Sequence, residues 1–534
     1  MEDGNNPVSS NKETVVEIED SKHVEDLGHL VNQEEHDVNW WQCIKQNPKI
    51  VMWCLYSIWF IILASFDNAA GISTISIPEF RKDFGSPFNG DYVLPARWQS
   101  AYNGAPTAFT VASSLSAGLI ADRFGRKLTF FIAFIVSFIG VTVEMISTTN
   151  AVFFVGKSVN GVAIGLIISV GMTYVGEITP PALRGLTTAA CALAFTFGPW
   201  IGSFIVLGTG TKTNRWAYRA MFASQYGFNV TGFVFLWWLP ESPWWLVSKN
   251  RKEAALQSLQ ILGLSVTDAH KKVANIELTL EANRQETDGA TYFECFRRSN
   301  LRRTIISIAP LSIHAFAGIS FLGTYFAYYI QLSGISTENS FRIGVINGIA
   351  NVIANLVSLL FIDRVGRRNL SLIGMVLIVL LLAAFSACAA VGTPLAAKVS
   401  VACVMIWAVV FNVTIGATAY TIVTEIATPR LRVKTIALGL ALQNTWNTMW
   451  AFVLPFIFNP NEANLGGKTG FIFVGFSFLA LVYMFFYQPE TAHRTYEEID
   501  ELFAKRVPAR AFKTYQTEAE LKGIEAKGRE KTHV

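Results

Sequence analysis

The hexapeptide DRFGRK at residues 122–127 returns as DRVGRR at residues 363–368, and this repetition is the strongest sign of how the chain is organised. Two further echoes follow in the same order. GEITPPALRG, with Glu177, is matched by TEIATPRLR, with Glu425, and Pro240-Glu241-Ser242 is matched by Pro489-Glu490-Thr491. Three echoes at nearly equal displacement predict a duplicated unit, with one copy in each half of the chain.

Composition separates this chain from soluble proteins. Hydrophobic residues make up 51% of its 534 residues and charged residues only 15%, against roughly 25% charged in soluble proteins. The mean hydropathy of +0.37 comes from repeated apolar runs of about 20 residues, long enough to cross a bilayer core as helices. We expect spans near residues 51–73, 99–120, 128–147, 152–175, 188–208, 219–239, 305–332, 340–362, 370–391, 396–424, 434–458 and 470–487. The predicted fold class is an all-α membrane protein with twelve transmembrane helices in two pseudo-symmetric six-helix bundles.

Charged segments divide the chain further. Positive residues follow the even-numbered spans, as at Arg126, Arg184 and Arg367, and such residues are retained on the cytoplasmic side. Both termini and the central loop are then cytosolic, and the segment 74–98 faces outward. The predicted units are a disordered cytosolic tail (1–50), an N-terminal bundle (51–240), a cytosolic linker with short helices (241–303), a C-terminal bundle (304–488) and a cytosolic tail (489–534).

Several functional classes are disfavoured. The net charge of +4 is small, and basic residues form no stripe with interleaved aromatics, which argues against a nucleic-acid partner. The six cysteines make no CxxC or Cys/His pattern, so neither a disulfide framework nor a metal site is expected. No nucleophile and base pair or phosphate loop stands out. We therefore expect no enzyme activity, no cofactor and no metal.

The paired loops, the E-x-x-x-x-x-x-R elements at Glu177 and Glu425 and the PES/PET pair together resemble the sugar porter family of the major facilitator superfamily, over about residues 50–505. PESPWWLVSKNR at 240–251 and RTYEEIDELF at 494–503 look most like fungal permeases for maltose and other α-glucosides. The resemblance implies a proton-coupled or facilitative sugar carrier with two six-helix bundles and a cytosolic helical loop.

The resemblance also implies charge networks on the cytosolic face that latch the outward-facing state. Exposed ion pairs are individually worth only about 0–1 kcal/mol, so such a network would tip a near-balanced equilibrium. The alternative interpretation is that these charges only set topology. The gating residues implied are Asp122, Arg123, Arg126, Glu177, Arg184, Glu241, Asp363, Arg364, Arg367, Glu425, Arg432 and Glu490.

Asp67 lies inside the first predicted span, where a carboxylate costs on the order of 2.5–3.5 kcal/mol by insertion scales. It matches the family position at which an Asp gives and takes a proton. The family usually places an Arg in span four as its partner, and here the matching pair is Gly156-Lys157. We expect Asp67 and Lys157 to serve proton coupling. The alternatives are an Asp that reaches water at the outer boundary and a Lys that snorkels to the interface.

The sugar site is where the resemblance weakens. The span-seven QQ-x-x-G-x-N element reads HAFAGIS at 314–320, and Ala192 stands where the family has a span-five Gln. Polyol recognition needs amides, carboxylates and an aromatic face, so this cavity is expected to be more apolar. The remaining candidates for substrate contact, each also open to a plain packing role, are His314, Ser320, Tyr325, Asn347, Tyr420, Asn444, Trp446 and Asn447.

The sequence therefore favours a proton-coupled plasma-membrane transporter of oligosaccharides, α-glucosides or hexoses that works by alternating access. A carrier of the same fold for a less polar metabolite is the second interpretation, because the family's amide ligands are missing. A non-transporting sugar sensor is the third. The substrate, the direction of flux and the oligomeric state stay open.

Overall fold

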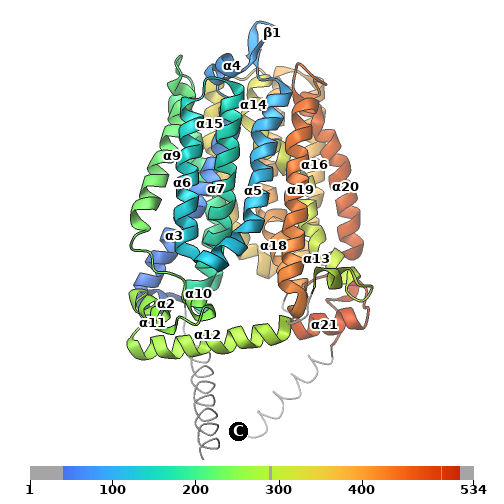
Figure 1. The fold of residues 1–534 in the computed structure, drawn as a ribbon. Helices are drawn as coiled ribbons and strands as arrows, with labels where there is room; N and C mark the ends of the chain where they lie inside the picture. The colour runs from blue at the N-terminus through green and yellow to red at the C-terminus, as the bar shows by residue number, and fades with distance from the viewer. Residues whose placement is uncertain (1–39, 288–290, 493, 495, 518–534) are drawn as a thin grey trace, which may run out of the picture.

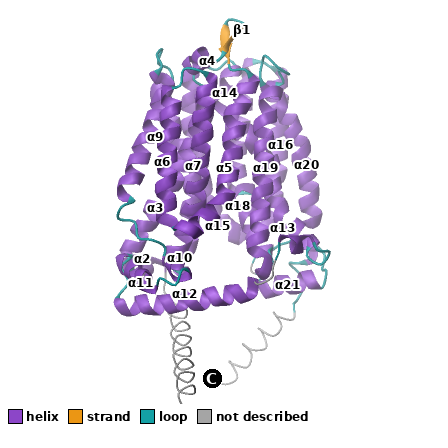
Figure 2. Cartoon of the chain, in the orientation of Figure 1, coloured by secondary structure: helices purple, strands orange, loops and turns teal. Residues whose placement is uncertain are grey.

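The computed structural model describes residues 40–287, 291–492, 494 and 496–517. Within them nearly all regular structure is helical, and long helices run side by side between two ends of the molecule (Figures 1 and 2). The first bundle consists of α3 (Pro48–Thr74), α5 (Ala96–Phe124), α6 (Arg126–Ile146), α7 (Asn150–Ile178), α8 (Arg184–Thr209) and α9 (Trp216–Phe235).

The second bundle repeats this arrangement. Its six spans are α13 (Leu301–His314) with the π-helix η3 (Ala315–Gly323) and α14 (Thr324–Leu332); α15 (Thr337–Val365); α16 (Arg367–Val391); α17 (Pro394–Val413) with α18 (Ile415–Ile426); α19 (Arg432–Phe458); and α20 (Gly470–Tyr487). Ten of the twelve spans are long and apolar enough to cross a membrane by length and composition, and the less apolar α9 and α19 run alongside them (Figure 1). The predicted fold class is confirmed.

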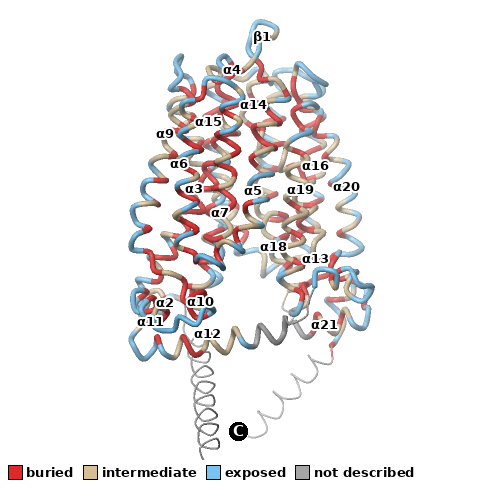
Figure 3. The backbone as a smooth tube through the Cα atoms, viewed as in Figure 1, coloured by how far each residue is buried: buried red, intermediate tan, exposed pale blue. Residues whose placement is uncertain are grey.

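The outer surface of the bundles is apolar, as expected for a chain solvated by lipid. Leu119 is 77% exposed and Trp237 is 67% exposed, and Figure 3 shows exposed residues along the outer helices α9 and α20. Large exposed apolar surface is rare on soluble monomers. The interior of the first bundle is mostly apolar too, and it also buries polar side chains such as Asp67 and Glu144.

Two spans that the sequence predicts as continuous are broken. Gly318 in η3 has φ +98°, a conformation that glycine adopts far more readily than other residues. Thr414 separates α17 from α18 with φ −111° and ψ −85°. Polar backbone groups freed by such breaks are tolerated at membrane depth only inside protein or beside a cavity.

One end of the molecule, called here the hairpin end, carries α4 (Pro78–Phe84) and the antiparallel strands β1 (Ser86–Phe88) and β2 (Asp91–Val93), which pair Ser86 with Val93. The other, the linker end, carries short helices (Figure 1). These are α2 (Trp40–Gln46), η1 (Pro181–Leu183), α10 (Pro243–Ser248), α11 (Lys252–Ile261), α12 (Val266–Thr287), η2 (Tyr292–Phe296), η4 (Pro429–Leu431), α21 (Tyr496–Ala504) and η6 (Ala509–Ala511). The short η5 (Gly466–Thr469) precedes α20.

Helix α12 packs on α10 and α11 below the first bundle and reaches η4 of the second. It therefore ties the two bundles together at the linker end. Residues 40–50, which the sequence assigns to a disordered tail, form α2 and the first turn of α3. The rest of that predicted tail, residues 1–39, and the end of the C-terminal one, 518–534, lie outside the described residues.

Candidate functional site

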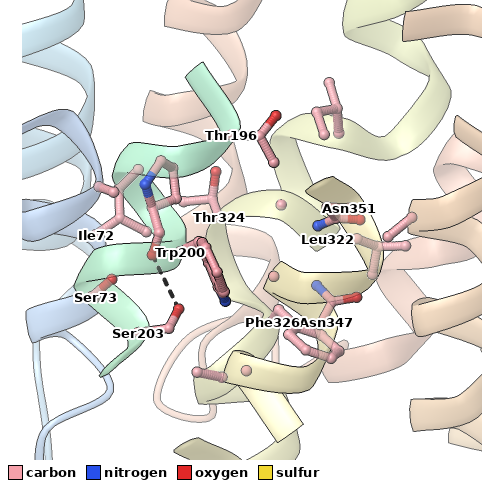
Figure 4. A pocket seen from close by; sticks show the side chains of 18 of the residues that line it. Ile72, Ser73, Thr196, Trp200, Ser203, Leu322, Thr324, Phe326, Asn347 and Asn351 are labelled. Atoms are coloured by element: carbon pink, nitrogen blue, oxygen red, sulfur yellow. Dashed lines mark hydrogen bonds between the residues drawn. The ribbon is translucent and has the colours of Figure 1, made fainter. Parts of the chain in front are cut away.

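A cavity of about 380 Å³ lies between the two bundles. The first bundle contributes residues of α3 and α8 to its wall, and the second contributes η3, α14, α15 and α17. Figure 4 shows Trp200 of α8 with Asn347 and Asn351 of α15 around this space. Its volume falls in the range of about 300–1,000 Å³ typical of small-molecule sites.

Four polar atoms of the cavity's lining residues have no hydrogen-bond partner within the described chain. They are the indole Nε1 atoms of Trp200 and Trp407, the hydroxyl of Tyr328 and Oδ1 of Asn347. Indole N–H groups only donate, an amide oxygen accepts, and a phenol does both. Buried polar groups are normally paired. The lining residues thus hold unpaired donors and acceptors of the kinds that hydroxyl groups can pair with.

A chain of asparagines continues from this wall. Asn347, Asn351 and Asn355 are spaced four residues apart on α15, which places them on one face of the helix. Asn412 of α17 donates to Asn351 Oδ1 at 3.2 Å, and Asn355 donates to Asn412 Oδ1 at 3.3 Å. Asn355 also donates to Thr196 Oγ1 of α8 at 2.8 Å, so the chain crosses between the bundles. Sequence reasoning selected only Asn347, although the four-residue spacing was visible.

Two of the predicted substrate residues, Tyr325 and Asn347, line this cavity. His314 and Tyr420 instead meet at Gln443 of α19, which the sequence analysis missed. Gln443 Nε2 lies 3.0 Å from His314 Nδ1, and Tyr420 Oη lies 3.3 Å from Gln443 Oε1. The remaining four predicted residues, Ser320, Asn444, Trp446 and Asn447, do not line the cavity.

Three of these four sit on the contact between η3, α13 and α19. Ser320 Oγ donates to Asn447 Oδ1 at 3.3 Å, and Trp446 Nε1 donates to Ser312 Oγ at 3.3 Å. These bonds join helices within the second bundle. In this conformation they hold the broken span seven against α19.

The first bundle buries a cluster of charged groups near the hairpin end. Asp67 of α3 and Glu144 of α6 are fully buried, and Lys157 of α7 is 3% exposed. Lys157 Nζ lies 3.6 Å from Glu144 Oε1 and donates to the backbone carbonyl of Asp67 at 3.2 Å. The sequence pairs Lys157 with the Asp67 carboxylate, whereas in the structure its ion pair is with Glu144. Glu144 is a residue that sequence reasoning missed.

Neutral side chains complete this cluster. Ser137 Oγ lies 3.5 Å from Asp67 Oδ2 and donates to Asn160 Oδ1 at 3.2 Å, and Asn229 of α9 donates to Ser137 at 3.0 Å. Asn160 donates to Glu144 Oε1 at 3.3 Å. One oxygen of each carboxyl, Asp67 Oδ1 and Glu144 Oε2, has no partner in the described residues.

Glycines allow this close approach. A Cβ atom on Gly71 would lie 2.5 Å from Lys157 Cε and 2.7 Å from its Nζ, so the lysine side chain crosses α3 at the glycine. A Cβ on Gly156 would lie 2.8 Å from the backbone N of Glu144, and one on Gly140 would lie 2.8 Å from that of Asn160. Small residues at helix contacts are how membrane helices pack closely.

At the linker end, the first repeated charge network is formed within the first bundle. Arg126 of α6 donates to both carboxylate oxygens of Glu177 at 2.7 and 3.1 Å and to Asp122 at 3.3 Å. The backbone N–H of Arg126 donates to Glu241 at 2.8 Å. Bidentate guanidinium–carboxylate bonds of this kind are among the stronger polar contacts in proteins.

The second bundle repeats this pairing. Arg367 donates to Glu425 at 3.0 and 3.2 Å, and its backbone N–H donates to Glu490 at 2.8 Å. The predicted network residues Arg123, Arg184 and Arg364 are exposed, and Arg432 is half-buried. The side chain of Asp363 lies outside the described residues. The duplication read from the sequence is thus matched in the residues that pair at Arg126 and Arg367, although Arg367 directs both donors to Glu425 Oε1 and Thr491 donates to Glu425 Oε2.

At the hairpin end, hydrogen bonds cross between the bundles. Arg81 of α4 donates to Gln331 Oε1 of α14 at 2.9 Å, and Gln331 donates to the Ser76 carbonyl at 2.8 Å. Arg81 is 6% exposed and lies over the Tyr328 ring, 5.3 Å from its centroid. Burial lowers the pKa of the Arg81 guanidinium, and Tyr328 and Asp91 act in the opposite direction. An arginine stays charged near neutral pH, so this contact holds a full positive charge.

Further bonds reinforce this closure. Gln99 of α5 donates to Asn459 at 3.0 Å, Ser100 donates to the Phe452 carbonyl of α19 at 2.8 Å, and Asn103 donates to the Tyr325 hydroxyl at 3.1 Å. The charge networks at the linker end, by contrast, join residues of the same bundle. The structure is therefore a state closed at the hairpin end.

Comparison with known proteins yields relatives of similar length. The chain is 27% identical over 498 residues to a general alpha-glucoside permease of Saccharomyces cerevisiae, covering 91% of this chain and 80% of the relative. It is 29% identical over 484 residues to the maltose permease MAL61 of the same species, covering 88% and 78%. It is 27% identical over 522 residues to the MFS transporter fmqE of Aspergillus fumigatus, covering 93% and 97%.

Solved structures share the fold. The inward-open xylose transporter XylE of E. coli superposes with a TM-score of 0.69 at 20% identity, covering 85% of this chain and 99% of that one. The XylE proton:xylose symporter bound to 6-bromo-6-deoxy-D-glucose gives a TM-score of 0.67 at 20% identity, covering 86% and 100%. The family model described as "Sugar (and other) transporter" matches residues 21–503. This multi-pass membrane protein therefore belongs to the sugar (and other) transporter family of the major facilitator superfamily.

Proposed function

We propose that this protein is a proton-coupled transporter of sugars of the oligosaccharide, α-glucoside or hexose class, working by alternating access. The observation that carries the proposal is the cavity between the bundles, with the unpaired polar atoms of Trp200, Asn347, Tyr328 and Trp407 on its lining residues. Sugars present many hydroxyls that both donate and accept, and an apolar ring face that can stack on indole. Relatives named as alpha-glucoside and maltose permeases support the same substrate class.

The proposed orientation places the hairpin end outside the cell and the linker end, with both termini, in the cytosol. It is supported by the clusters at Arg126, Arg184 and Arg367, which lie at the linker end. With this orientation the structure is an inward-facing state, closed outside by the bonds of Arg81, Gln99 and Asn103. The plasma membrane is the proposed location, by likeness to the yeast permeases.

In the proposed cycle Asp67 takes up a proton from outside and releases it to the cytosol. Uptake is supported by its complete burial and its unpaired Oδ1, and release by the nearby Lys157 side chain, whose positive charge favours an ionised carboxyl. A buried carboxylate without full compensation is costly, which favours proton uptake. The networks at Arg126 and Arg367 are proposed to re-form across the bundles when the linker end closes, which would stabilise the outward-facing state.

The test is uptake of labelled glucose, maltose, lactose, cellobiose and xylose by yeast that lacks its own sugar transporters, with and without a protonophore. Uptake of at least one sugar that the protonophore abolishes is expected for the wild type and not for Asp67→Asn. Surface expression measured on a fluorescent fusion controls for trafficking. If no sugar enters cells that display the protein, the proposal fails.

Apolar cavity residues favour a second candidate, a carrier of a less polar metabolite. Ile72, Phe195, Ile319, Leu322 and Phe326 share the wall with the polar groups. In that case the unpaired polar atoms would bind only the few polar groups of the transported metabolite. The two candidates are separated by adding hydrophobic glycosides during sugar uptake. A sugar carrier should bind the fully hydroxylated sugar more tightly than the glycosides, and a carrier of less polar compounds should bind the glycosides more tightly.

A further inference from the structure

We infer that Glu144 is a second proton-site carboxyl, and that Asp67, Glu144 and Lys157 together hold one exchangeable proton. The inference deepens the proposed proton coupling, and the role it gives to this proton rests on that proposed function. It starts from the observation that Lys157 forms its ion pair with Glu144, at 3.6 Å, and touches Asp67 only through the backbone carbonyl.

The count of charges requires a proton. Two carboxyls and one ammonium are enclosed together, and none of the three side chains reaches solvent to more than a few per cent. If both carboxyls were ionised, one negative charge would be buried without compensation, at a cost of several kcal/mol. A proton on one carboxyl makes the cluster neutral. Two interacting carboxyls then titrate as a pair, as such groups do elsewhere.

Among the described residues, no other charged side chain forms an ion pair or a hydrogen bond with these three. The charged side chains that act on Asp67 are Lys157 of α7 and Glu144 of α6, and Lys157 is the one that acts on Glu144. Helix α9 contributes the neutral amide of Asn229 through Ser137. The charges of α4 are engaged elsewhere, because Arg81 bonds Gln331 and Asp83 pairs with Arg215.

The unpaired oxygens show where a proton can reside. Asp67 Oδ1 and Glu144 Oε2 are both buried and without a partner among the described residues. Neither oxygen accepts a hydrogen bond, so either one can carry the proton. The Lys157 side chain crosses α3 at Gly71, and its Nζ contacts both α3, at the Asp67 carbonyl, and α6, at Glu144. When Asp67 loses its proton to the cytosol, the ammonium can turn to the new carboxylate, and the proton of the next cycle restores the present arrangement.

Glu144 thereby sets how tightly the cluster holds its proton. While Glu144 neutralises Lys157, Asp67 faces no unpaired cation and favours its neutral form. With a glutamine in place of Glu144, Lys157 would be free to pair with an ionised Asp67. An opposite charge close to a carboxyl lowers its pKa by about 1–3.

The test needs no transport substrate. Purified protein in lipid vesicles is titrated while infrared difference spectroscopy records the carbonyl-stretch band of protonated carboxylic acids. At pH 7 exposed carboxyls with an ordinary pKa near about 4 are ionised, so the band reports buried groups. The wild type should show one such group, Glu144→Gln and Asp67→Asn should each remove it, and Lys157→Met should approximately double it.

Matched variants keep the test decisive. Glu144→Asp retains a carboxyl and should retain the band, and Glu338→Gln, an exposed residue paired with Arg342 on α15, should not change it. If Glu144→Gln does not fold, the doubling expected for Lys157→Met carries the test. A wild type without the band, or a Glu144→Gln protein whose band is unchanged, overturns the inference. If the bands are as predicted but the protein shows no proton-driven uptake, the proposed transport function is overturned and the inference about the proton site is not.

Discussion

Arg81 of α4 and Gln331 of α14 join the two bundles at the hairpin end, where the guanidinium donates to the amide oxygen at 2.9 Å. The arginine is buried, and it also contacts the Ile75 carbonyl and the Tyr328 ring. A hydrogen bond from a charged group is worth about 1.5–3 kcal/mol. This contact therefore contributes to the stability of the state closed at that end.

Arg81→Gln should shift the protein toward the state open at the hairpin end. A loss of about 1.5 kcal/mol changes a two-state ratio about tenfold. The measurement is labelling of a Ser73→Cys variant, placed on the cavity wall, by an impermeant thiol reagent added to intact cells. Lys82→Gln, which removes an adjacent exposed charge, is the control. Equal labelling rates with and without the Arg81→Gln substitution would show that the contact does not stabilise the closed state.

The cavity should recognise its substrate through Asn347 and Trp200. Asn347→Ala removes an unpaired acceptor, and Trp200→Phe removes an indole donor while keeping a ring. Each lost hydrogen bond of about 1 kcal/mol should raise KM for the transported sugar about fivefold. Asn444→Ala, at a position that the sequence suggested but that does not line the cavity, should have a smaller effect. The opposite ranking in uptake kinetics would place the substrate near α19 instead.

The repeated networks predict matched losses of stability. Glu177→Gln and Glu425→Gln each weaken a pair of hydrogen bonds from an arginine, Arg126 or Arg367. Each kcal/mol lost should lower Tm by about 2–4 °C for a bundle of this size. Arg184→Gln, at an exposed position, should leave Tm unchanged. Thermal unfolding of the purified proteins checks this, and a large difference between the two glutamate variants would argue against equivalent roles.

Gly71→Ala should impair coupling without preventing folding. The new Cβ would lie 2.5 Å from Lys157 Cε, and the flexible end of the lysine can move aside. That movement would take the ammonium away from Asp67 and Glu144, so proton-driven uptake should fall about tenfold, as for a loss of about 1.4 kcal/mol. Gly227→Ala, where a Cβ meets open space, is the control. Unchanged uptake at equal surface expression would mean that the position of Lys157 is unimportant.

The spans could be predicted from the sequence because apolar runs and the repeated DR-x-GR loops mark them directly. The breaks at Gly318 and Thr414 could not, since a single glycine or threonine in an apolar run is compatible with a continuous helix. Lys157 and Asp67 were visible as charges inside apolar runs. Their relationship was not, because it depends on how closely α3, α6 and α7 pack.

Glu144 was missed for a similar reason. It lies near the end of an apolar run, where a carboxylate is readily interpreted as an interface residue, and only the packing of Gly140 and Gly156 shows it to be buried. The substrate residues were predicted from spans seven, eight, ten and eleven, by comparison with family motifs and from retained polar side chains. The cavity wall also includes residues of α3, α8 and α17, helices from which the sequence selected no substrate residue.

The central claim is that sugar movement is driven by protons through Asp67. The most direct measurement is accumulation of labelled maltose in proteoliposomes in which a pH gradient, acidic on the hairpin side, is the only source of energy. Wild-type protein should concentrate maltose above the external level, and Asp67→Asn should exchange maltose across the membrane without concentrating it. Accumulation by the Asp67→Asn protein equal to the wild type, or equilibration by the wild type regardless of the gradient, would contradict the account.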